Sequence, residues 1–166
     1  MVNQPISAKR GEVFFRKKLT QQQIGNKILF PLEYSHEEIS HNIEKKLIRA
    51  RKDFRYLQNK KVQFSPFLEI GTGYGQTSLL LTNEYNSQGY ACEIAFDPLN
   101  AIYELKKRYQ FKKLPRLIIC DAEHLPFANN SFPFIFCYQT LHHFPHPICV
   151  TKEVYRILAP GGYFFF

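Results

Sequence analysis

The order of apolar and polar positions changes character along the chain. Residues 1–32 mix lysine, glutamine and phenylalanine without a regular period, which is typical of an arm or extension. Residues 35–57 show helical spacing, and from Val62 onwards short apolar runs alternate with helical segments. We therefore expect a basic N-terminal arm and amphipathic helix over residues 1–61, followed by one α/β domain over residues 62–166.

The N-terminal helix has both a start signal and two distinct faces. Ser35 and Glu38 have the spacing of a capping box, in which each side chain satisfies a backbone N–H at the helix start. One face is an apolar stripe at helical spacing: Ile39, Ile43, Leu47, Ala50, Phe54 and Leu57. The other face is basic: Lys45, Lys46, Arg49, Arg51, Lys52 and Arg55. This pattern predicts a helix that lies across the domain with its basic side in water.

The second part of the chain alternates between two periods. Short apolar runs at 65–70, 89–96, 116–120, 132–139 and 161–166 predict five buried strands. The segments at 75–85, 98–109 and 147–158 have helical spacing. Strands that alternate with helices imply right-handed crossovers. The expected architecture is therefore a Rossmann-like, doubly wound and mostly parallel sheet with helices on both faces.

Charge divides the chain as hydropathy does. The net charge is +8 over 166 residues, and residues 1–61 hold 14 Lys and Arg against 6 Asp and Glu. Residues 62–166 hold 8 of each, so the excess lies entirely in the N-terminal part. Such a patch suits nucleic acid or an anionic surface, but a solvated helix face is the preferred explanation. It lacks the interleaved aromatic residues that single-stranded nucleic acid needs.

Several functional classes are disfavoured by composition. No apolar run is long enough to span a membrane, and the N-terminus lacks the apolar segment of a signal peptide, so we expect a cytoplasmic protein. The cysteines form no CxxC pair and are expected to be small buried thiols: Cys92, Cys120, Cys137 and Cys149. The "HHFPHPIC" segment matches no zinc spacing, so no metal site is expected.

The candidate chemistry begins where the first strand of the domain ends. Gly71, Gly73 and Gly75 follow the strand at alternate positions, and Glu69 precedes them. Glycine permits positive φ and lets a ligand lie against the backbone. Ligands bind this fold class at the carboxyl ends of the strands, where the strand order reverses. The spacing is ExGxGxG and not the GxGxxG of dinucleotide sites, because Gln76 stands where the third glycine would fall.

Three ordered segments resemble one family. "LEIGTGYG", "CDAEHLPFANNSFPFIFCYQTLHHF" and "EVYRILAPGGYFFF" resemble the motifs of class I S-adenosylmethionine-dependent methyltransferases. The resemblance is greatest to the small-molecule branch related to ubiquinone/menaquinone biosynthesis, and it runs from Phe67 to Phe166. It implies S-adenosylmethionine as cofactor and a small-molecule methyl acceptor.

The resemblance also assigns cofactor-binding residues. Gly71, Thr72, Gly73 and Gly75 would border the methionine and ribose portions, and Glu69 would hold local polar geometry and face the cationic end. Two acids compete for the ribose hydroxyls: Glu93 is preferred, and Asp97 is the substitute, with a helix cap before Pro98 as its alternative role. Asp121, with the backbone of Ala122, would contact the adenine, and Tyr138 would line the pocket.

Catalytic residues are harder to assign from the pattern. Methyl transfer from a sulfonium depends largely on positioning and on exclusion of water. His142 and His143 follow the fourth strand, where an acceptor would approach, and histidine can take a proton near neutral pH. The alternative is that "LHHF" is a structural turn. Pro133 replaces the acid that the family has on entering this strand, and a proline cannot donate to the ladder.

The end of the sequence departs from the family. The family fold continues after the fifth strand with another helix and an antiparallel strand pair, for which no residues follow Phe166. We expect a truncated product, a piece of a longer protein, or a partner that covers the apolar edge of the sheet. Three hypotheses therefore remain for function. They are methylation of a small molecule, methylation of RNA guided by the basic helix, and a non-catalytic module that binds cofactor or a partner.

Overall fold

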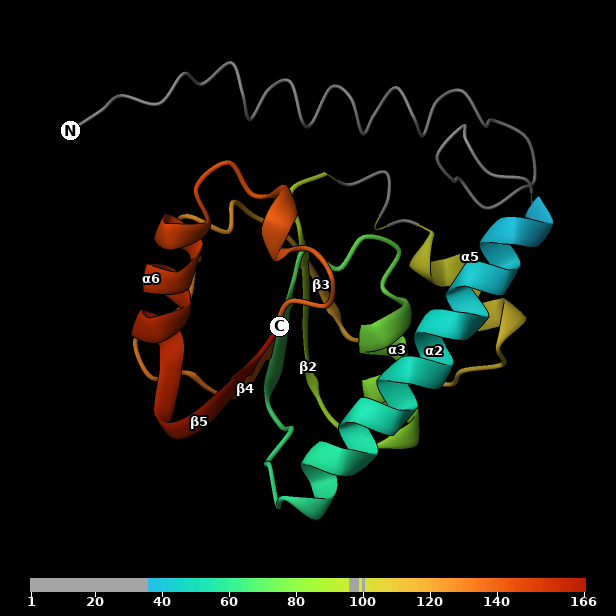
Figure 1. Ribbon diagram of the computed structural model, residues 1–166, viewed down its shortest axis with the longest axis horizontal. Helices are drawn as coiled ribbons and strands as arrows, with labels where there is room; N and C mark the ends of the chain where they lie inside the picture. Colours follow the sequence, from blue (N-terminus) through green and yellow to red (C-terminus); the bar gives the residue numbers. More distant parts are fainter. Residues whose placement is uncertain (1–35, 96–98, 100) are drawn as a thin grey trace.

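The structure is a three-layer α/β arrangement built on one parallel sheet (Figure 1). The computed structural model describes residues 36–95, 99 and 101–166, with side chains from residue 41 onwards. Its helices are α2 (His36–Asn59), α3 (Gln76–Glu84), α5 (Ile102–Arg108), η1 (Leu141–His143, a 3₁₀ turn) and α6 (Pro147–Ile157). Its strands are β1 (Phe67–Ile70), β2 (Gly89–Glu93), β3 (Arg116–Ile119), β4 (Phe132–Phe136) and β5 (Leu158–Phe165).

The sheet has the doubly wound topology that the sequence predicted. Its order within the described residues is β3-β2-β1-β4-β5, and every neighbouring pair is parallel. The chain runs outward from β1 through β2 to β3, then returns to place β4 on the other side of β1. The strand order therefore reverses between β1 and β4, directly beside the glycine loop. Among the described residues β5 pairs only with β4, so its outer edge has no strand beside it.

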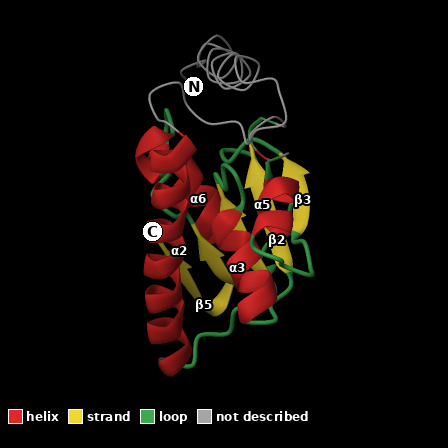
Figure 2. Ribbon diagram, turned by 90° about the vertical axis from the view of Figure 1, so that its right-hand side faces the viewer, coloured by secondary structure: helices red, strands yellow, loops and turns green. Residues whose placement is uncertain are grey.

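Two apolar layers hold the helices to the sheet. α2, α3 and α5 pack on one face with Phe67, Phe134 and Phe136, and Figure 2 shows these helices side by side over the strands. α6 packs on the other face through Val150, Val154 and Ile157, against strand residues that point the opposite way. Because side chains alternate along a strand, β1 supplies Phe67 to the first layer and Leu68 and Ile70 to the second.

The N-terminal helix packs as its stripe predicted. Ile43, Leu47, Ala50 and Phe54 are buried in the first layer, whereas most of the basic residues face solvent. The exposed cations are Lys45, Lys46, Arg49, Lys52 and Arg55. Arg51 is half-buried and forms a bidentate ion pair with Glu84 on α3, with Nε donating at 2.8 and 3.0 Å. Of the predicted capping box, Ser35 lies outside the described residues.

The proline in the fourth strand disturbs the ladder as expected. The β4–β5 register runs Phe132 to Leu158 and then Phe134 to Tyr163, so a bulge of β5 faces Pro133. Gly162 lies in this bulge, where a Cβ would stand 2.9 Å from the Pro133 carbonyl oxygen. Strand β5 consequently begins at Leu158, three residues before the strand expected from the apolar run.

Candidate functional site

The loop after β1 has the backbone that its glycines suggested. Gly71, Gly73 and Gly75 have φ of +68°, +56° and +75°, a region that side chains disfavour. The loop is tied to β2 by the Thr72 amide, which donates to the Cys92 carbonyl at 3.0 Å. A Cβ at Gly71 would overlap the Thr140 side chain, and one at Gly73 would meet nothing within 4 Å. The loop is therefore closely packed at its first glycine and open at its second.

Glu69 supports this loop from below. The residue is 2% exposed, and its Oε2 accepts hydrogen bonds from the Thr72 hydroxyl at 2.7 Å and from the Ser78 hydroxyl. Burial raises the pKa of the Glu69 carboxyl to about 7, and the two hydroxyl donors oppose that rise. The predicted role in local polar geometry thus has a structural basis. The side chains of Glu69 and Thr72 are hydrogen-bonded to each other, and Glu69 is also bonded to Ser78 on α3. Neither Glu69 nor Thr72 lines the hollow described below.

The raised pKa gives a test of this arrangement. The unfolded carboxyl titrates near 4.5 and the folded one near 7, so the folded state holds the proton more tightly. The stabilisation is complete below about pH 4.5 and is lost as the pH rises through 7. We expect wild type to lose stability relative to Glu69→Gln between about pH 4.5 and 7, by up to ~1.4 kcal/mol per pH unit, and the difference to level off above pH 7. Urea unfolding at each pH measures this difference, with exposed Glu104→Gln as control. Parallel curves for wild type and Glu69→Gln would contradict the assignment.

Glu93 holds the glycine loop from the tip of β2. It is 3% exposed, and its two carboxylate oxygens accept from the amides of Gly73 at 2.8 Å and Ile94 at 2.9 Å. Each oxygen keeps a lone pair for a further donor. The substitute candidate, Asp97, lies outside the described residues.

A hollow lies where the strand order reverses, and we call it the central hollow. It holds about 550 Å³ of space that includes its mouth to solvent. Four segments line it: the loop after β1, the tip of β2, the turn after β3 and the segment after β4. The lining residues are Gly71, Cys92, Glu93, Ile94, Cys120, Asp121, Ala122, Glu123, Thr140, His143, Phe144 and Pro145.

Five of the twelve sequence-predicted site residues border this hollow. Gly71, Glu93, Asp121, Ala122 and His143 line it, although they come from four separate segments. Asp121 begins a tight turn, in which its Oδ1 accepts from the Glu123 amide at 2.9 Å. The lining residues that sequence reasoning missed are Cys92, Ile94, Cys120, Glu123, Thr140, Phe144 and Pro145. All of them follow or end a strand at the same edge of the sheet, which is the signal that could have found them.

The two histidines take different positions on η1. His143 lines the central hollow, whereas His142 borders a second, shallower hollow, which we call the outer hollow. Their ring centroids are 4.0 Å apart. The residues around the outer hollow are Cys137, Gln139, Thr140, Leu141, His142, Pro147 and Phe166. Thr140 lines both hollows, and its hydroxyl donates to the Gly71 carbonyl at 3.0 Å.

Tyr138 and Gly75 lie outside both linings. The Tyr138 hydroxyl donates to Asp53 of α2 at 2.8 Å, and its ring lies 6.1 Å from that of Phe165. The sequence pattern placed Tyr138 in the fourth strand, where it would line the pocket. β4 instead ends two residues earlier, at Phe136, and the Tyr138 side chain bonds to α2. Gly75 instead gives room to Ile102, whose side chain a Cβ would overlap.

The exposure of the four cysteines differs in part from the prediction. Cys92 and Cys137 are buried, as predicted, but Cys120 is half-buried and Cys149 is exposed, which corrects the expectation of four buried thiols. Cys149 lies on α6 beside Val150, and only one side of this helix packs on the sheet.

The described residues contain no cluster of three His, Cys, Asp or Glu that could hold a metal ion. No helix among them is long and apolar enough to cross a membrane.

Comparison with known proteins adds to this geometry. Residues 68–166 match the model of a family described as a methyltransferase domain. A malonyl-[acyl-carrier protein] O-methyltransferase of Marinomonas sp. (strain MWYL1) is 31% identical over 100 residues, covering 60% of this chain and 36% of the relative. The ubiquinone/menaquinone biosynthesis C-methyltransferase UbiE of Desulfotalea psychrophila is 32% identical over 96 residues, covering 57% and 37%.

Solved structures share this fold. The PH0226 protein from Pyrococcus horikoshii OT3 superposes with a TM-score of 0.61 at 26% identity, covering 78% of this chain and 54% of that one. The matched part of this chain corresponds to about a third of the length of these curated relatives.

Proposed function

The chain belongs to the methyltransferase domain family, and we propose that it binds S-adenosylmethionine in the central hollow and transfers the methyl group to a small-molecule acceptor. One observation carries the proposal. The positive-φ glycine loop and Glu93 meet at the switch point of the sheet, and the Gly73 amide is held by the Glu93 carboxylate. This is where an open α/β sheet offers backbone and acid to a nucleoside.

The residues present suit the chemistry of this cofactor. The free lone pairs of Glu93 can accept from two ribose hydroxyls, and Asp121 can accept from the amino group of an adenine. Ile94, Ala122 and Phe144 offer apolar surface to the faces of the base. The open space beside Gly73 leaves room for the backbone to approach the ligand. When bound, the cofactor supplies an electrophilic methyl group on a sulfonium.

The chain's own contribution to transfer is chiefly positional. The loop, Glu93 and Asp121 would fix the ligand, and Phe144 and Pro145 would reduce its contact with water. The acceptor would lie in the outer hollow, whose walls include Leu141, Pro147 and Phe166 and therefore suit an apolar molecule. His142 borders that hollow and His143 the central one, so each is a candidate to take a proton from the acceptor.

Titration calorimetry tests the binding step. We expect folded wild type to bind S-adenosylmethionine and not NADH, and Glu93→Ala to weaken binding by roughly tenfold to a hundredfold through lost charged hydrogen bonds. Glu104→Ala, an exposed acid on α5, is the matched control. Because Glu93 also holds the Gly73 amide, thermal unfolding of each variant should accompany the titration. Undetectable binding by folded wild type would sink the proposal. Binding without methyl transfer to any metabolite pool would favour a non-catalytic module.

A further inference from the structure

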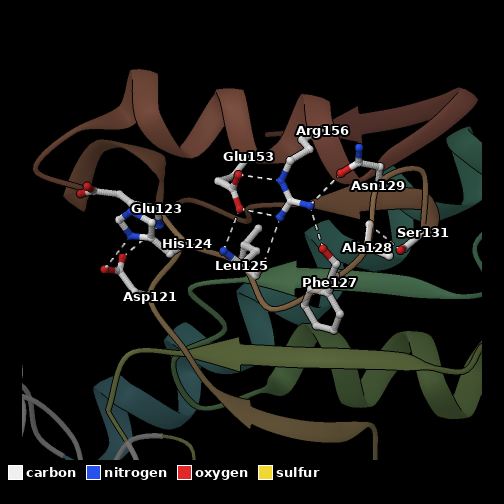
Figure 3. Close-up of polar contacts among 10 residues, drawn as sticks. All are labelled: Asp121, Glu123, His124, Leu125, Phe127, Ala128, Asn129, Ser131, Glu153 and Arg156. Atoms are coloured by element: carbon white, nitrogen blue, oxygen red, sulfur yellow. Dashed lines mark hydrogen bonds and ion pairs between the residues drawn. The ribbon is translucent and has the colours of Figure 1, made fainter.

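Two charged residues of α6 grip the segment that connects β3 to β4. Figure 3 shows Glu153 and Arg156 facing this segment, with hydrogen bonds in both directions. Arg156 donates to Glu153 through Nε and Nη2, at 2.7 Å each, so the pair is bidentate. The remaining N–H groups of the guanidinium donate to the segment between β3 and β4. The sequence motif contains both residues, but neither borders the central hollow.

The guanidinium fixes the backbone of the segment. Arg156 donates to the carbonyls of Leu125 at 2.9 Å and Phe127 at 2.8 Å, and to the Asn129 side chain at 3.0 Å. Glu153 accepts from the Leu125 amide at 2.8 Å. One ion pair therefore holds both the N–H and the C=O of Leu125. Only a planar fork with several donors can satisfy these acceptors together.

Leu125 is joined to the hollow by a tight turn. The His124 amide donates to the Asp121 carbonyl at 3.0 Å, and the Glu123 amide donates to the Asp121 carboxylate at 2.9 Å. Leu125 is 4% exposed and packs in the layer beneath α6. Asp121 and Ala122, which line the hollow, are thus separated from the gripped residue by a turn whose backbone is internally bonded.

We propose that Glu153 and Arg156 are positioning residues that hold Asp121 and Ala122 in place to recognise the base of a bound nucleoside. This inference rests on the proposed cofactor site. A carboxylate at Asp121 accepts from the amino group of adenine and is opposed by the carbonyl that hypoxanthine has at the same place. Recognition of this kind requires an acid fixed within a fraction of an ångström. The grip on Leu125 supplies that constraint from outside the hollow.

Base discrimination tests the proposal. The affinities of wild type for S-adenosylhomocysteine and S-inosylhomocysteine give a ratio of dissociation constants. The second ligand has a carbonyl in place of the amino group and a hydrogen on the adjacent ring nitrogen, so the ratio reports recognition of this edge of the base. We expect a ratio of about tenfold or more in wild type, falling to within about threefold in Arg156→Met. General loss of stability would weaken both ligands and leave the ratio unchanged. Arg156→Lys keeps the charge but lacks the fork of donors, so its base ratio should fall as in Arg156→Met. Because it is the more conservative substitution, it is the variant to use if Arg156→Met unfolds.

Hydrogen exchange tests the grip without ligand. We expect the amides of His124 and Leu125 to exchange at least about tenfold faster in the Arg156 variants than in wild type. Arg51→Met is the matched control, because it removes a bidentate Arg–Glu pair of the same kind between α2 and α3. Unchanged exchange at these amides, or an unchanged base ratio in a folded Arg156 variant, overturns the inference. Failure of wild type to bind S-adenosylhomocysteine overturns the proposed function, and the base-recognition role with it.

Discussion

Gly71→Ala is expected to destabilise the protein by roughly 2 to 5 kcal/mol and to abolish measurable binding of S-adenosylmethionine. The backbone at Gly71 has φ of +68°, which costs a residue with a Cβ about 1–3 kcal/mol. The new methyl would also overlap the Thr140 side chain and stand 3.3 Å from the Phe144 ring. Both neighbours line the central hollow, so relief of the overlap would deform it. Urea unfolding and titration calorimetry measure the two effects.

The neighbouring glycine and Thr140 provide the controls. Gly73→Ala has φ of +56° but no atom within 4 Å of the new methyl, so it should cost only about 1–2 kcal/mol of backbone strain. Thr140→Ser keeps the hydroxyl that donates to the Gly71 carbonyl and removes the overlapping methyl. It should therefore restore part of the stability of Gly71→Ala. Equal losses for the two glycine variants, without rescue by Thr140→Ser, would show that the Thr140 contact is not the cause.

Phe54→Ala should cost about 3–5 kcal/mol of unfolding free energy, the range for deletion of a buried aromatic ring. Phe54 is fully buried, with ring centroids 5.6 to 6.2 Å from four aromatic neighbours. These are Phe64, Tyr85, Phe134 and Phe136. The ring therefore attaches α2 to β4, and its loss leaves a cavity among these aromatic side chains.

Tyr56→Ala is the control for this prediction. Tyr56 lies two residues further along α2 and is 61% exposed, so its removal should change stability by less than about 1 kcal/mol. Urea unfolding followed by circular dichroism measures both variants. If the two cost the same, the helix is not attached through Phe54.

The fold was predictable because its pattern is local and repeated. The apolar stripe through Leu47 and Phe54 and the alternation of apolar runs with helical segments each depend on spacing within one element. The alternation of strands with helices then implied a doubly wound, mostly parallel sheet. The bulge of β5 was harder to predict from the sequence. Pro133 indicated irregular pairing in β4. The extra residues of the bulge lie on β5, and no local pattern in β4 predicts which residues these are.

The site was predictable as a place more than as a set of contacts. The glycine loop and the acids Glu93 and Asp121 end neighbouring strands, so topology alone brings them together. The direction of a side chain is decided by its partners. Glu69 points to Ser78 on α3, and Tyr138 points to Asp53 on α2. Apart from Glu153, the partners of Arg156 lie 27 to 31 residues earlier in the chain, a separation that the motif spacing does not reveal.

Among the described residues, Thr140 alone lines both the central and the outer hollow. We call the Thr140 side chain, which contributes to the wall of each hollow, the partition. Its hydroxyl is tied to the Gly71 carbonyl, so the partition is anchored to the loop on one side and continues into η1 on the other. When the proposed ligands occupy the two hollows, the bulk of this one threonine would therefore set how near they can come to each other at this point.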